Sequence, residues 1–330
     1  MGEVMRAIVL SENCAPETLR VSNVPKPAPA SGQVLIRVAY CALNPLDTHA
    51  RAGRIKWGVP SMPFTLGYEY AGRVEVLGEG VDDSWLGRRV AVFGSWGGCA
   101  EYAVAPVAEL RAVPDELDWP TASAYFTTSF TSWHLVHTAG QVKRGQVVVV
   151  HSAAGAVGVM TSQILRDAGA HVIGLVSSQT KAVWAKPYGV HDWIITSEQP
   201  FDVAVRALTA GRGADLIIDG VQGPEASKNL ACLAPMGRVI YIGATGGPAA
   251  PVNIGQLIAG SIGVQGFVVQ HAMALTQGSE AKEIHHALIS GRWKLPLNPP
   301  SELDEVGALH ADFEARKLMG RTVIRVGGDV

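Results

Sequence analysis

The feature that most constrains the fold of this chain is a run of small residues between an apolar segment and a helical one. Residues 146–150 read Gln-Val-Val-Val-Val, a short apolar run of the kind that forms a strand covered on both faces. The run His151-Ser152-Ala153-Ala154-Gly155-Ala156-Val157-Gly158 follows, and a helical pattern covers residues 156–167. The spacing Ala-x-Gly-x-x-Gly matches the glycine fingerprint of dinucleotide sites, with alanine at its first position. Because it lies between a strand and a helix, it predicts a cofactor pyrophosphate at the helix N-terminus, although small residues would also permit tight strand–helix packing alone.

The rest of the chain divides into two patterns. After about Pro120, β-like runs alternate with helical patterns, which is typical of βαβ units and a parallel sheet. The first 120 residues instead contain short β segments separated by proline and glycine, which favours a twisted, partly closed β-rich domain. A lone strand over residues 321–326 should return to that domain and make it discontinuous. The other expected strands cover residues 33–38, 72–77, 88–93, 171–176, 214–218 and 237–242.

Composition excludes several classes of protein. The 330 residues are 48% hydrophobic and 17% charged, which is typical of a well-packed globular protein with room for two domains. A net charge of −2 gives no overall field for nucleic acid or an anionic membrane, and no apolar run is long enough to span a bilayer. The N-terminus lacks a signal-peptide pattern, so we expect a cytoplasmic protein. The scattered cysteines predict neither structural zinc nor disulfides; they are Cys14, Cys41, Cys99 and Cys232.

The end of the expected second strand of the parallel sheet indicates which dinucleotide binds. Sites that prefer NAD usually place an acidic residue there, which accepts a hydrogen bond from the ribose 2′-hydroxyl. This chain has no acidic residue between Asp167 and Asp192, and the strand is followed by Ser177, Ser178 and Lys181. Two hydroxyls and an ammonium suit a 2′-phosphate, so the pattern predicts NADPH. Without a ligand, Lys181 would be an ordinary solvated lysine at a helix start.

Four ordered motifs resemble the quinone oxidoreductases of the medium-chain dehydrogenase/reductase superfamily, and the similarity extends over nearly the whole chain. The motifs cover residues 44–53 (NPLDTHARAG), 66–72 (LGYEYAG), 97–102 (GGCAEY) and 153–158 (AAGAVG). The resemblance implies an α/β protein with a GroES-like β-rich catalytic domain, residues 1–124 and 269–330. Residues 125–268 would form a Rossmann domain with a doubly wound parallel sheet. It also implies a homodimer, formed by pairing the last Rossmann strands around residues 261–267.

The same resemblance implies a zinc-independent protein. Zinc-dependent relatives carry a cysteine where this chain has Asn44 and a histidine where it has Tyr68. Neither residue offers the nitrogen or sulfur ligand that zinc requires, so no metal ligand is expected. Tyr68 is counted instead among the candidate catalytic residues.

The resemblance also assigns the other candidate residues. Asn44 and Thr131 would lie beside the nicotinamide and the substrate, and His49 stands where relatives often have a tyrosine that faces the substrate. Arg316 would help to hold the 2′-phosphate, whereas Thr196 replaces a tyrosine of relatives at that phosphate. Without a ligand, Asn44 would be a turn residue, His49 a half-buried helix residue and Thr131 a helix cap. The expected cofactor site comprises Asn44, Thr131, Ala154, Gly155, Ala156, Val157, Gly158, Ser177, Ser178, Lys181, Gly243, Phe267 and Arg316.

These assignments predict an NADPH-dependent oxidoreductase that transfers hydride to a quinone or to an activated C=C bond of an α,β-unsaturated carbonyl. Such acceptors stabilise the accepted charge by conjugation and depend less on a Lewis acid. An imidazole exchanges protons near neutral pH, so His49 is the candidate for influencing protonation of the product anion. Two alternatives share the motifs: an enoyl reductase acting on acyl or polyketide thioesters, and an NADPH-binding structural or regulatory protein with little turnover.

Overall fold

The computed structural model of the chain describes residues 3–248 and 251–327. The chain forms two compact units, which we call the β-rich unit and the parallel-sheet unit. The β-rich unit comprises the chain up to Thr127 and from Pro296 onward, and the parallel-sheet unit comprises Thr128–Leu295. The long helix α2 (Trp119–His134) passes from the first unit into the second.

In the parallel-sheet unit, short apolar strands alternate with helices, as the sequence predicts. Its elements in the described residues are η4 (Leu135–Ala139), β9 (Val147–Val150), α3 (Ala156–Asp167), β10 (His171–Val176), α4 (Gln179–Ala185), β11 (Asp192–Ile195), α5 (Phe201–Leu208), β12 (Ala214–Asp219), η5 (Pro224–Ser227), α6 (Lys228–Ala231), β13 (Leu233–Tyr241), α7 (Ile254–Gly260), β14 (Gly263–Gly266), α8 (Val269–Thr276) and α9 (Ala281–Ile289).

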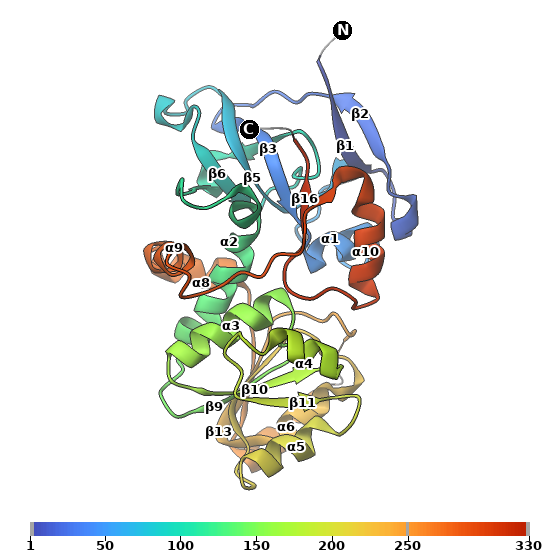
Figure 1. The fold of residues 1–330 in the computed structure, drawn as a ribbon. Coiled ribbons are helices and arrows are strands. Elements are labelled where there is room, and N and C mark those ends of the chain that lie inside the picture. The colour runs from blue at the N-terminus through green and yellow to red at the C-terminus, as the bar shows by residue number, and fades with distance from the viewer. Residues whose placement is uncertain (1–2, 249–250, 328–330) are drawn as a thin grey trace. The chain divides into compact units, whose positions relative to one another are not determined.

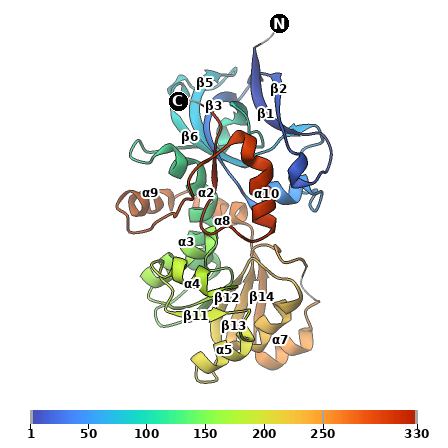
Figure 2. The ribbon, with the colours of Figure 1, turned by 45° about the vertical axis from the view of Figure 1, so that its right-hand side comes forward.

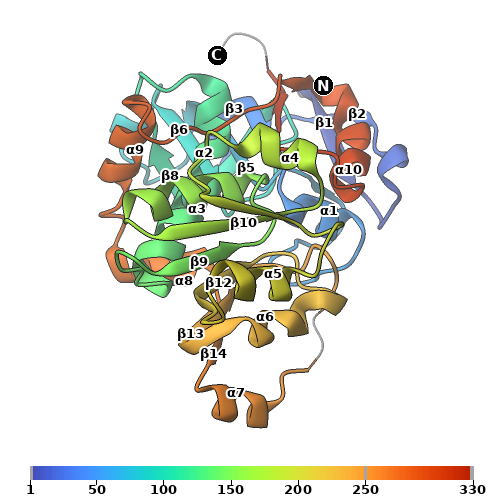
Figure 3. The same ribbon diagram turned by 60° about the horizontal axis from the view of Figure 1, so that its bottom comes forward.

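The strands of this unit form one parallel sheet in the order β11-β10-β9-β12-β13-β14. Figures 1 and 3 show α3 and α4 on one face of the sheet and α5 and α6 on the other. Val149, Ile173 and Ile217 are buried on one face of the sheet. The residues that precede them, Val148, Val172 and Leu216, are buried on the other face, so these strands are apolar on both faces. The strand order reverses between β9 and β12, and ligands of doubly wound sheets bind at the carboxyl ends of the strands at such a point. The predicted Rossmann fold is confirmed.

The β-rich unit contains short strands with few helices. Its elements in the described residues are β1 (Val4–Leu10), η1 (Pro16–Thr18), β2 (Val21–Pro25), β3 (Gln33–Ala42), α1 (Pro45–Arg51), β4 (Phe64–Thr65), β5 (Glu69–Leu77), η2 (Asp83–Trp85), β6 (Arg89–Phe93), β7 (Tyr102–Pro106), η3 (Val107–Glu109), β8 (Leu110–Ala112), β15 (Ser301–Glu302), η6 (Leu303–Glu305), α10 (Val306–Glu314) and β16 (Val323–Arg325).

The C-terminal segment returns to this unit, as predicted. Strand β16 pairs with β3 in antiparallel register, with Val323 opposite Ala42. Helix α10 packs against η1, and Figures 1 and 2 show the red α10 beside the blue N-terminal elements. A Cβ at Gly307 would lie 2.7 Å from the carbonyl oxygen of Pro16, so glycine allows this close approach. The β-rich domain is therefore discontinuous in sequence.

The second domain boundary lies later than the predicted one. The resemblance placed it between residues 268 and 269, whereas the parallel-sheet unit continues to Leu295. The reason is that α8, α9 and the segment after them pack on this unit. The indole N–H of Trp293 donates to Asp167 (2.8 Å), and Gln163 forms hydrogen bonds with both backbone groups of Lys294 (2.8 Å each). Similarly, the first boundary falls after Thr127 rather than after residue 124, within α2.

Candidate functional site

The predicted cofactor loop lies at the carboxyl end of the central strand. Strand β9 ends at Val150 and α3 begins at Ala156, with Gly155 as its N-cap. No side chain caps α3 among the described residues, and its first turn has no acidic residue. The N–H groups of the first turn of a helix have no partner within the helix, and the positive end of its dipole lies there. The start of α3 can therefore bind a phosphate group.

Gly158 lets the helix and the loop approach each other. A Cβ at this position would lie 2.4 Å from the carbonyl oxygen of Ser152 and 2.8 Å from the Cα of Ala153. These distances are shorter than any real Cβ contact, so a larger residue would push the start of α3 away from the loop. The last glycine of the dinucleotide fingerprint allows the helix to pack closely against the strand, and Gly158 has this role here.

The second part of the predicted cofactor site follows β10. Ser178 is the N-cap of α4, and its hydroxyl accepts a hydrogen bond from the backbone N–H of Lys181 (3.4 Å). Ser177 is exposed beside it. Thr196 lies next to this strand end, and its hydroxyl donates to the carbonyl of Val176 (3.2 Å), so it supports the strand. No acidic residue lies at this turn in the described chain, which fits a 2′-phosphate better than a 2′-hydroxyl.

Gly243 and Phe267 complete the set of cofactor residues predicted on the sheet. Gly243 follows β13, and its carbonyl accepts a hydrogen bond from the side chain of Gln222 (2.8 Å). Phe267 follows β14, and its N–H donates to the carbonyl of Tyr241 (2.9 Å). Since all six described strands are parallel, both residues lie at the same edge of the sheet as the cofactor loop. The structure thus brings the predicted residues of this unit to one edge.

Thr131 lies in the interior of α2 and not at its cap, so the alternative interpretation of Thr131 as a helix cap is wrong. The next residue, Ser132, donates to the carbonyl of Val157 (3.3 Å) and accepts from the hydroxyl of Thr161 (2.9 Å). These bonds hold this turn of α2 against the start of α3. One turn earlier, the hydroxyls of Thr128 and Ser129 are buried with no hydrogen-bond partner among the described residues. Buried polar groups without partners are rare in folded proteins, so these two hydroxyls fit a site that a polar ligand completes.

In the β-rich unit, Asn44 is the centre of a buried hydrogen-bond network. Its amide nitrogen donates to Glu69 (3.1 Å) and to the carbonyl of Ala42 (3.3 Å), and its amide oxygen accepts from Arg321 (3.1 Å). Glu69 is also paired with Arg321 and accepts the backbone N–H of Thr127 (2.8 Å). Both amide hydrogens of Asn44 are therefore used within the protein, and the residue holds the end of β3 rather than offering a donor outward.

Asp47 joins the two motif segments of this unit. Its carboxylate accepts the backbone N–H groups of Asn44 (2.9 Å), Gly67 (3.1 Å) and Tyr68 (3.2 Å). Burial raises the pKa of Asp47 to about 6, while the hydrogen bond from the N–H of Asn44 acts in the opposite direction. One side chain therefore fixes the positions of both Asn44 and Tyr68.

His49 is half-buried on α1, and its Nδ1 is buried without a hydrogen-bond partner in the described chain. Burial lowers the pKa of His49, and the nearby guanidinium of Arg54 lowers it further, while Glu314 opposes both. The imidazole is therefore mostly neutral at pH 7 and above. Proton donation by the imidazolium form of His49, which the sequence predicts, is therefore limited to acidic solutions.

We expect His49→Gln to lower kcat/KM for reduction by up to roughly 10²-fold at pH 5.5, the lower part of the range for general acid catalysis. The effect should vanish above about pH 7.5, because a histidine with a lowered pKa is neutral there in the wild type. Steady-state pH profiles of the two proteins check this, with cofactor affinity measured alongside and His286→Gln as the matched control. If the two profiles superimpose at every pH, the proton comes from solvent and His49 is structural.

Tyr68 belongs to an aromatic cluster. Its ring lies 5.1 Å from that of Phe93 and 5.0 Å from that of Trp96, between ring centroids, and Phe93 lies 5.6 Å from Phe126. Trp96 also contacts Phe64 edge-on at 5.1 Å. No sequence motif connects these rings. They provide flat apolar faces next to the segment that Asp47 holds in place.

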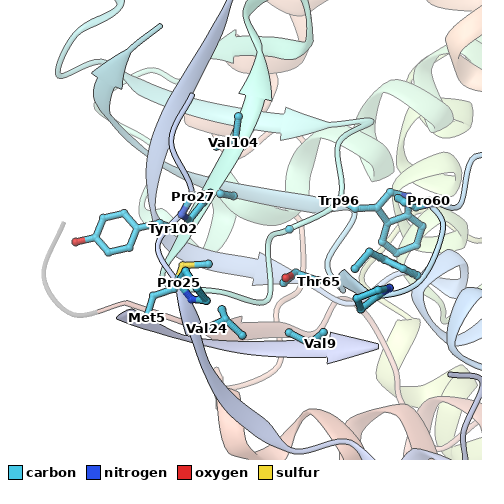
Figure 4. Close-up of a pocket in the computed structure, with 14 residues that line it drawn as sticks. Met5, Val9, Val24, Pro25, Pro27, Pro60, Thr65, Trp96, Tyr102 and Val104 are labelled. Carbon is cyan, nitrogen blue, oxygen red and sulfur yellow. The ribbon is translucent and has the colours of Figure 1, made fainter. Parts of the chain in front are cut away.

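Trp96 also lines a cavity of about 380 Å³ in the β-rich unit (Figure 4). The lining side chains are mainly apolar and come from β1, β2, β4 and β7 together with the prolines at 60 and 63. Asn44, His49 and Tyr68 are not among them. The cavity therefore lies beside the aromatic cluster without containing the predicted catalytic residues.

Arg316 follows α10 in the β-rich unit, with a backbone φ of 56°. Lys181 belongs to the parallel-sheet unit. The predicted partnership of these two residues at a 2′-phosphate therefore stays a prediction.

Comparison with known proteins identifies the family. The β-rich unit matches the alcohol dehydrogenase GroES-like domain over residues 30–115, and the parallel-sheet unit matches the zinc-binding dehydrogenase family over residues 156–283. A 2-haloacrylate reductase from a Burkholderia species is 30% identical, over 97% of this chain and 99% of that protein. The structure of a quinone oxidoreductase from Pseudomonas syringae pv. Tomato DC3000 matches with a TM-score of 0.91 and 31% identity, over 97% of this chain and 99% of that one. The chain belongs to the quinone oxidoreductase family.

Membership of this family, within the medium-chain dehydrogenase/reductase superfamily, confirms the predicted resemblance. A structure of Escherichia coli quinone oxidoreductase complexed with NADPH also matches, with a TM-score of 0.91 and 25% identity, over 97% of this chain and 99% of that one.

The residues of this quinone oxidoreductase family member do not fit a catalytic zinc ion, despite the name of the second matched family. The amide of Asn44 is used by Glu69 and Arg321, and the ring of Tyr68 packs among aromatic rings. In residues 3–248 and 251–327, no group of three or more His, Cys, Asp or Glu side chains could hold a metal ion. Likewise, no helix in these residues is long and apolar enough to cross a membrane.

We expect the purified protein to contain well under one zinc per chain and to keep its activity in a chelator, because neither position offers a zinc ligand. Elemental analysis by mass spectrometry, with an assay before and after dialysis against EDTA, checks this. About one zinc per chain, with activity lost on its removal, would show that the zinc ligands lie elsewhere.

Proposed function

We propose that this protein uses NADPH to reduce a quinone or the activated C=C bond of an α,β-unsaturated carbonyl. The observation that carries the proposal is the carboxyl edge of the parallel sheet. There an uncapped helix start, a glycine-packed loop and a serine- and lysine-bearing turn without an acidic residue lie together. A relative of the same fold, the Escherichia coli enzyme, was solved as a complex with NADPH, which supports the choice of cofactor. When bound, NADPH supplies a hydride from C4 of its nicotinamide.

Distinct groups of this chain would hold the parts of the cofactor. The N–H groups of Ala154–Gly158 suit the pyrophosphate, and Ser177, Ser178 and Lys181, with Arg316, suit the 2′-phosphate. The buried hydroxyls of Thr128, Ser129 and Thr131 can form hydrogen bonds with the polar groups of the nicotinamide half. The assignments for the pyrophosphate, the 2′-phosphate and the nicotinamide half rest on the type of donor and on its position in the parallel-sheet unit. Arg316 is the exception, because it belongs to the β-rich unit.

A conjugated acceptor suits the rest of the site. The side chains of Asn44, Asp47 and Glu69 are engaged in hydrogen bonds and an ion pair within the protein. This favours an acceptor that spreads the developing charge by conjugation or receives hydrogen bonds from other groups. The partly exposed ring of Trp96, which contacts Tyr68, can stack on a planar quinone or enone. The Burkholderia relative is named for the reduction of a 2-haloacrylate, whose C=C bond is conjugated with a carboxylate.

The test is NADPH consumption, followed at 340 nm, with a 1,4-quinone, a small enone and an enoyl thioester in parallel. We expect turnover with the quinone or the enone and a much lower kcat/KM with the thioester. The highest kcat/KM with the thioester would instead identify an enoyl reductase. NADPH binding without turnover of any acceptor would favour a structural or regulatory protein.

We expect Lys181→Ala to weaken NADPH binding by about 1.5–3 kcal/mol, because a charge-assisted hydrogen bond to the 2′-phosphate is lost. NADH binding should change little, since NADH lacks that phosphate. Fluorescence titration of both cofactors measures the two effects. Lys186→Ala, an exposed lysine at the C-terminal end of the same helix, is the matched control. Equal losses for NADH and NADPH would contradict the assignment.

We also propose a homodimer formed through β14. It is the last strand of its sheet, and no described strand pairs with its outer side. The adjacent helix α7, beside it in Figure 3, exposes Ile254 (64%) and Ile258 (75%). Pairing with a second copy would satisfy the strand edge and cover these side chains. Light scattering should give twice the chain mass for the wild type and a monomer for Ile258→Lys, whereas a monomeric wild type would contradict the proposal.

The state of the cysteines bears on the cellular location. All four are free thiols, and Cys41, Cys99 and Cys232 are buried. Free thiols suit a reducing compartment, so we propose that the protein is cytoplasmic.

A further inference from the structure

Cys41 and Cys99 form a pair of buried thiols that have no role in the proposed reaction. Cys41 lies near the end of β3, and Cys99 lies in the segment that leads into β7. Their Sγ atoms are 3.6 Å apart, and the two residues are 58 positions apart in sequence. Cys14 and Cys232 are not part of this contact. The spacing of the two cysteines matches no known motif, so the pair could not be predicted from the sequence.

We propose that Cys41 and Cys99 are the site of a reversible intramolecular disulfide, formed by oxidation with hydrogen peroxide. In the first step, a sulfur attacks peroxide, the O–O bond breaks, and a sulfenic acid and water form. In the second step, the other thiol sulfur attacks the sulfenic sulfur, the S–O bond breaks and a second water leaves. Two thiols thus lose two electrons, which reduce one peroxide to two waters.

The surroundings of the two sulfurs favour a disulfide over further oxidation. Each sulfenic acid would form beside a second thiol only 3.6 Å away, so a resolving partner is already in place. A bond length of about 2.05 Å requires the sulfurs to move together by about 1.5 Å. Gly97, two residues before Cys99, lines the cavity of the β-rich unit, so the segment that carries Cys99 borders this cavity.

The contact with Cys99 and then burial hold the pKa of the Cys41 thiol well above its ordinary value. Since the thiolate is the reactive form, the pair stays reduced at low peroxide and reacts slowly at neutral pH. The rate of disulfide formation should therefore still be rising with pH at pH 9.

The disulfide would disturb the segment that Asp47 holds. Gly67 is packed against both cysteines: a Cβ on it would lie 2.4 Å from the backbone nitrogen of Cys99 and 2.8 Å from Sγ of Cys41. The N–H of Gly67 donates to Asp47, and Asn44 follows Cys41 by three residues. A shift of about 1 Å in positioned groups can cost roughly 10²-fold in rate. We therefore expect oxidation to lower kcat/KM at least about tenfold and to change NADPH affinity much less, because the residues proposed for the pyrophosphate belong to the other unit.

The test uses the full-length Cys14→Ser/Cys232→Ser variant, in which only the pair remains. Reduced protein is treated with hydrogen peroxide at pH 7, 8 and 9, quenched with catalase and alkylated with N-ethylmaleimide in denaturant. We expect intact-mass spectra to show a monomer that is 2 Da lighter than the reduced, unalkylated protein and that carries no N-ethylmaleimide on either cysteine. This species should form faster at higher pH and should be reversed by dithiothreitol. Adding Cys41→Ser should abolish that species.

Two outcomes would overturn the proposal. Either both thiols still react with N-ethylmaleimide after the peroxide treatment, or they gain oxygen atoms without forming the lighter species. The effect on kcat/KM rests on the proposed function, whereas the mass measurement does not. A protein that forms the disulfide but never consumes NADPH would therefore refute the proposed function and not the disulfide site. Unchanged kcat/KM in the fully oxidised form of an active protein would refute the predicted effect on catalysis.

Discussion

Replacing Glu69 with glutamine is expected to lower the free energy of unfolding by about 3–5 kcal/mol, the usual cost of removing one partner from a buried ion pair. Glu69 and Arg321 are both buried and are 252 residues apart in sequence. In the variant, the guanidinium of Arg321 stays buried without its counter-charge. The amide cannot replace that charge, although it has nearly the same shape. Because Glu69 also holds Asn44, kcat/KM should fall with stability.

Urea unfolding followed by circular dichroism measures the change in the Glu69→Gln variant. Glu12→Gln, an exposed carboxylate of the same unit, is the matched control and should stay within about 0.5 kcal/mol of the wild type. The double variant Glu69→Gln/Arg321→Met should recover part of the loss, since it removes the unpaired charge. A loss below about 1 kcal/mol in the single variant would show that water or another group compensates Arg321.

Replacing Asp47 with asparagine is expected to change how stability depends on pH. Burial raises the pKa of Asp47 in the folded protein to about 6, from an ordinary value of 3.8. Between about pH 4 and pH 6 the folded state therefore binds more protons at this site than the unfolded state does. The contribution of Asp47 to the free energy of unfolding falls as the pH rises through this window. A shift of about two units corresponds to roughly 3 kcal/mol.

The measurement is the difference in free energy of unfolding between the wild type and Asp47→Asn at pH 4, 5, 6 and 7. We expect the wild type to lose up to roughly 3 kcal/mol relative to the variant across this range, because only the wild type ionises at this position. Glu116→Gln, an exposed carboxylate of the same unit, should leave the difference constant. If the difference between the wild type and Asp47→Asn is also constant, the pKa of Asp47 in the folded wild type has its ordinary value.

Local sequence patterns predicted the parts of the fold that depend on neighbours in the chain. The helix expected over residues 156–167 is α3, and the strand expected over residues 171–176 is β10, with the same bounds. Both follow from apolar periodicity and from a glycine fingerprint whose steric reason, at Gly158, is local. The return of the last strand to the β-rich unit was predicted as well, and β16 pairs with β3.

The sequence could not predict contacts between distant residues. The pairing of Glu69 with Arg321 and the packing of Trp293 on Asp167 join residues 252 and 126 positions apart. The first contact determines how Asn44 is held, and the second explains why the domain boundary lies at Leu295 rather than at residue 268. The lowered pKa of His49 likewise depends on burial and on Arg54, which periodicity does not reveal.

The most direct test of the central claim, that the protein reduces conjugated acceptors with hydride from NADPH, is isotope transfer. The protein is incubated with NADPH deuterated at C4, in separate reactions for the two faces of the ring, and with an enone in ordinary water. We predict that mass spectrometry and NMR of the product will show one deuterium at the carbon β to the carbonyl, from one of the two faces only. A reduced product without deuterium from either face, or consumption of NADPH with release of hydrogen peroxide instead of product, would contradict the claim.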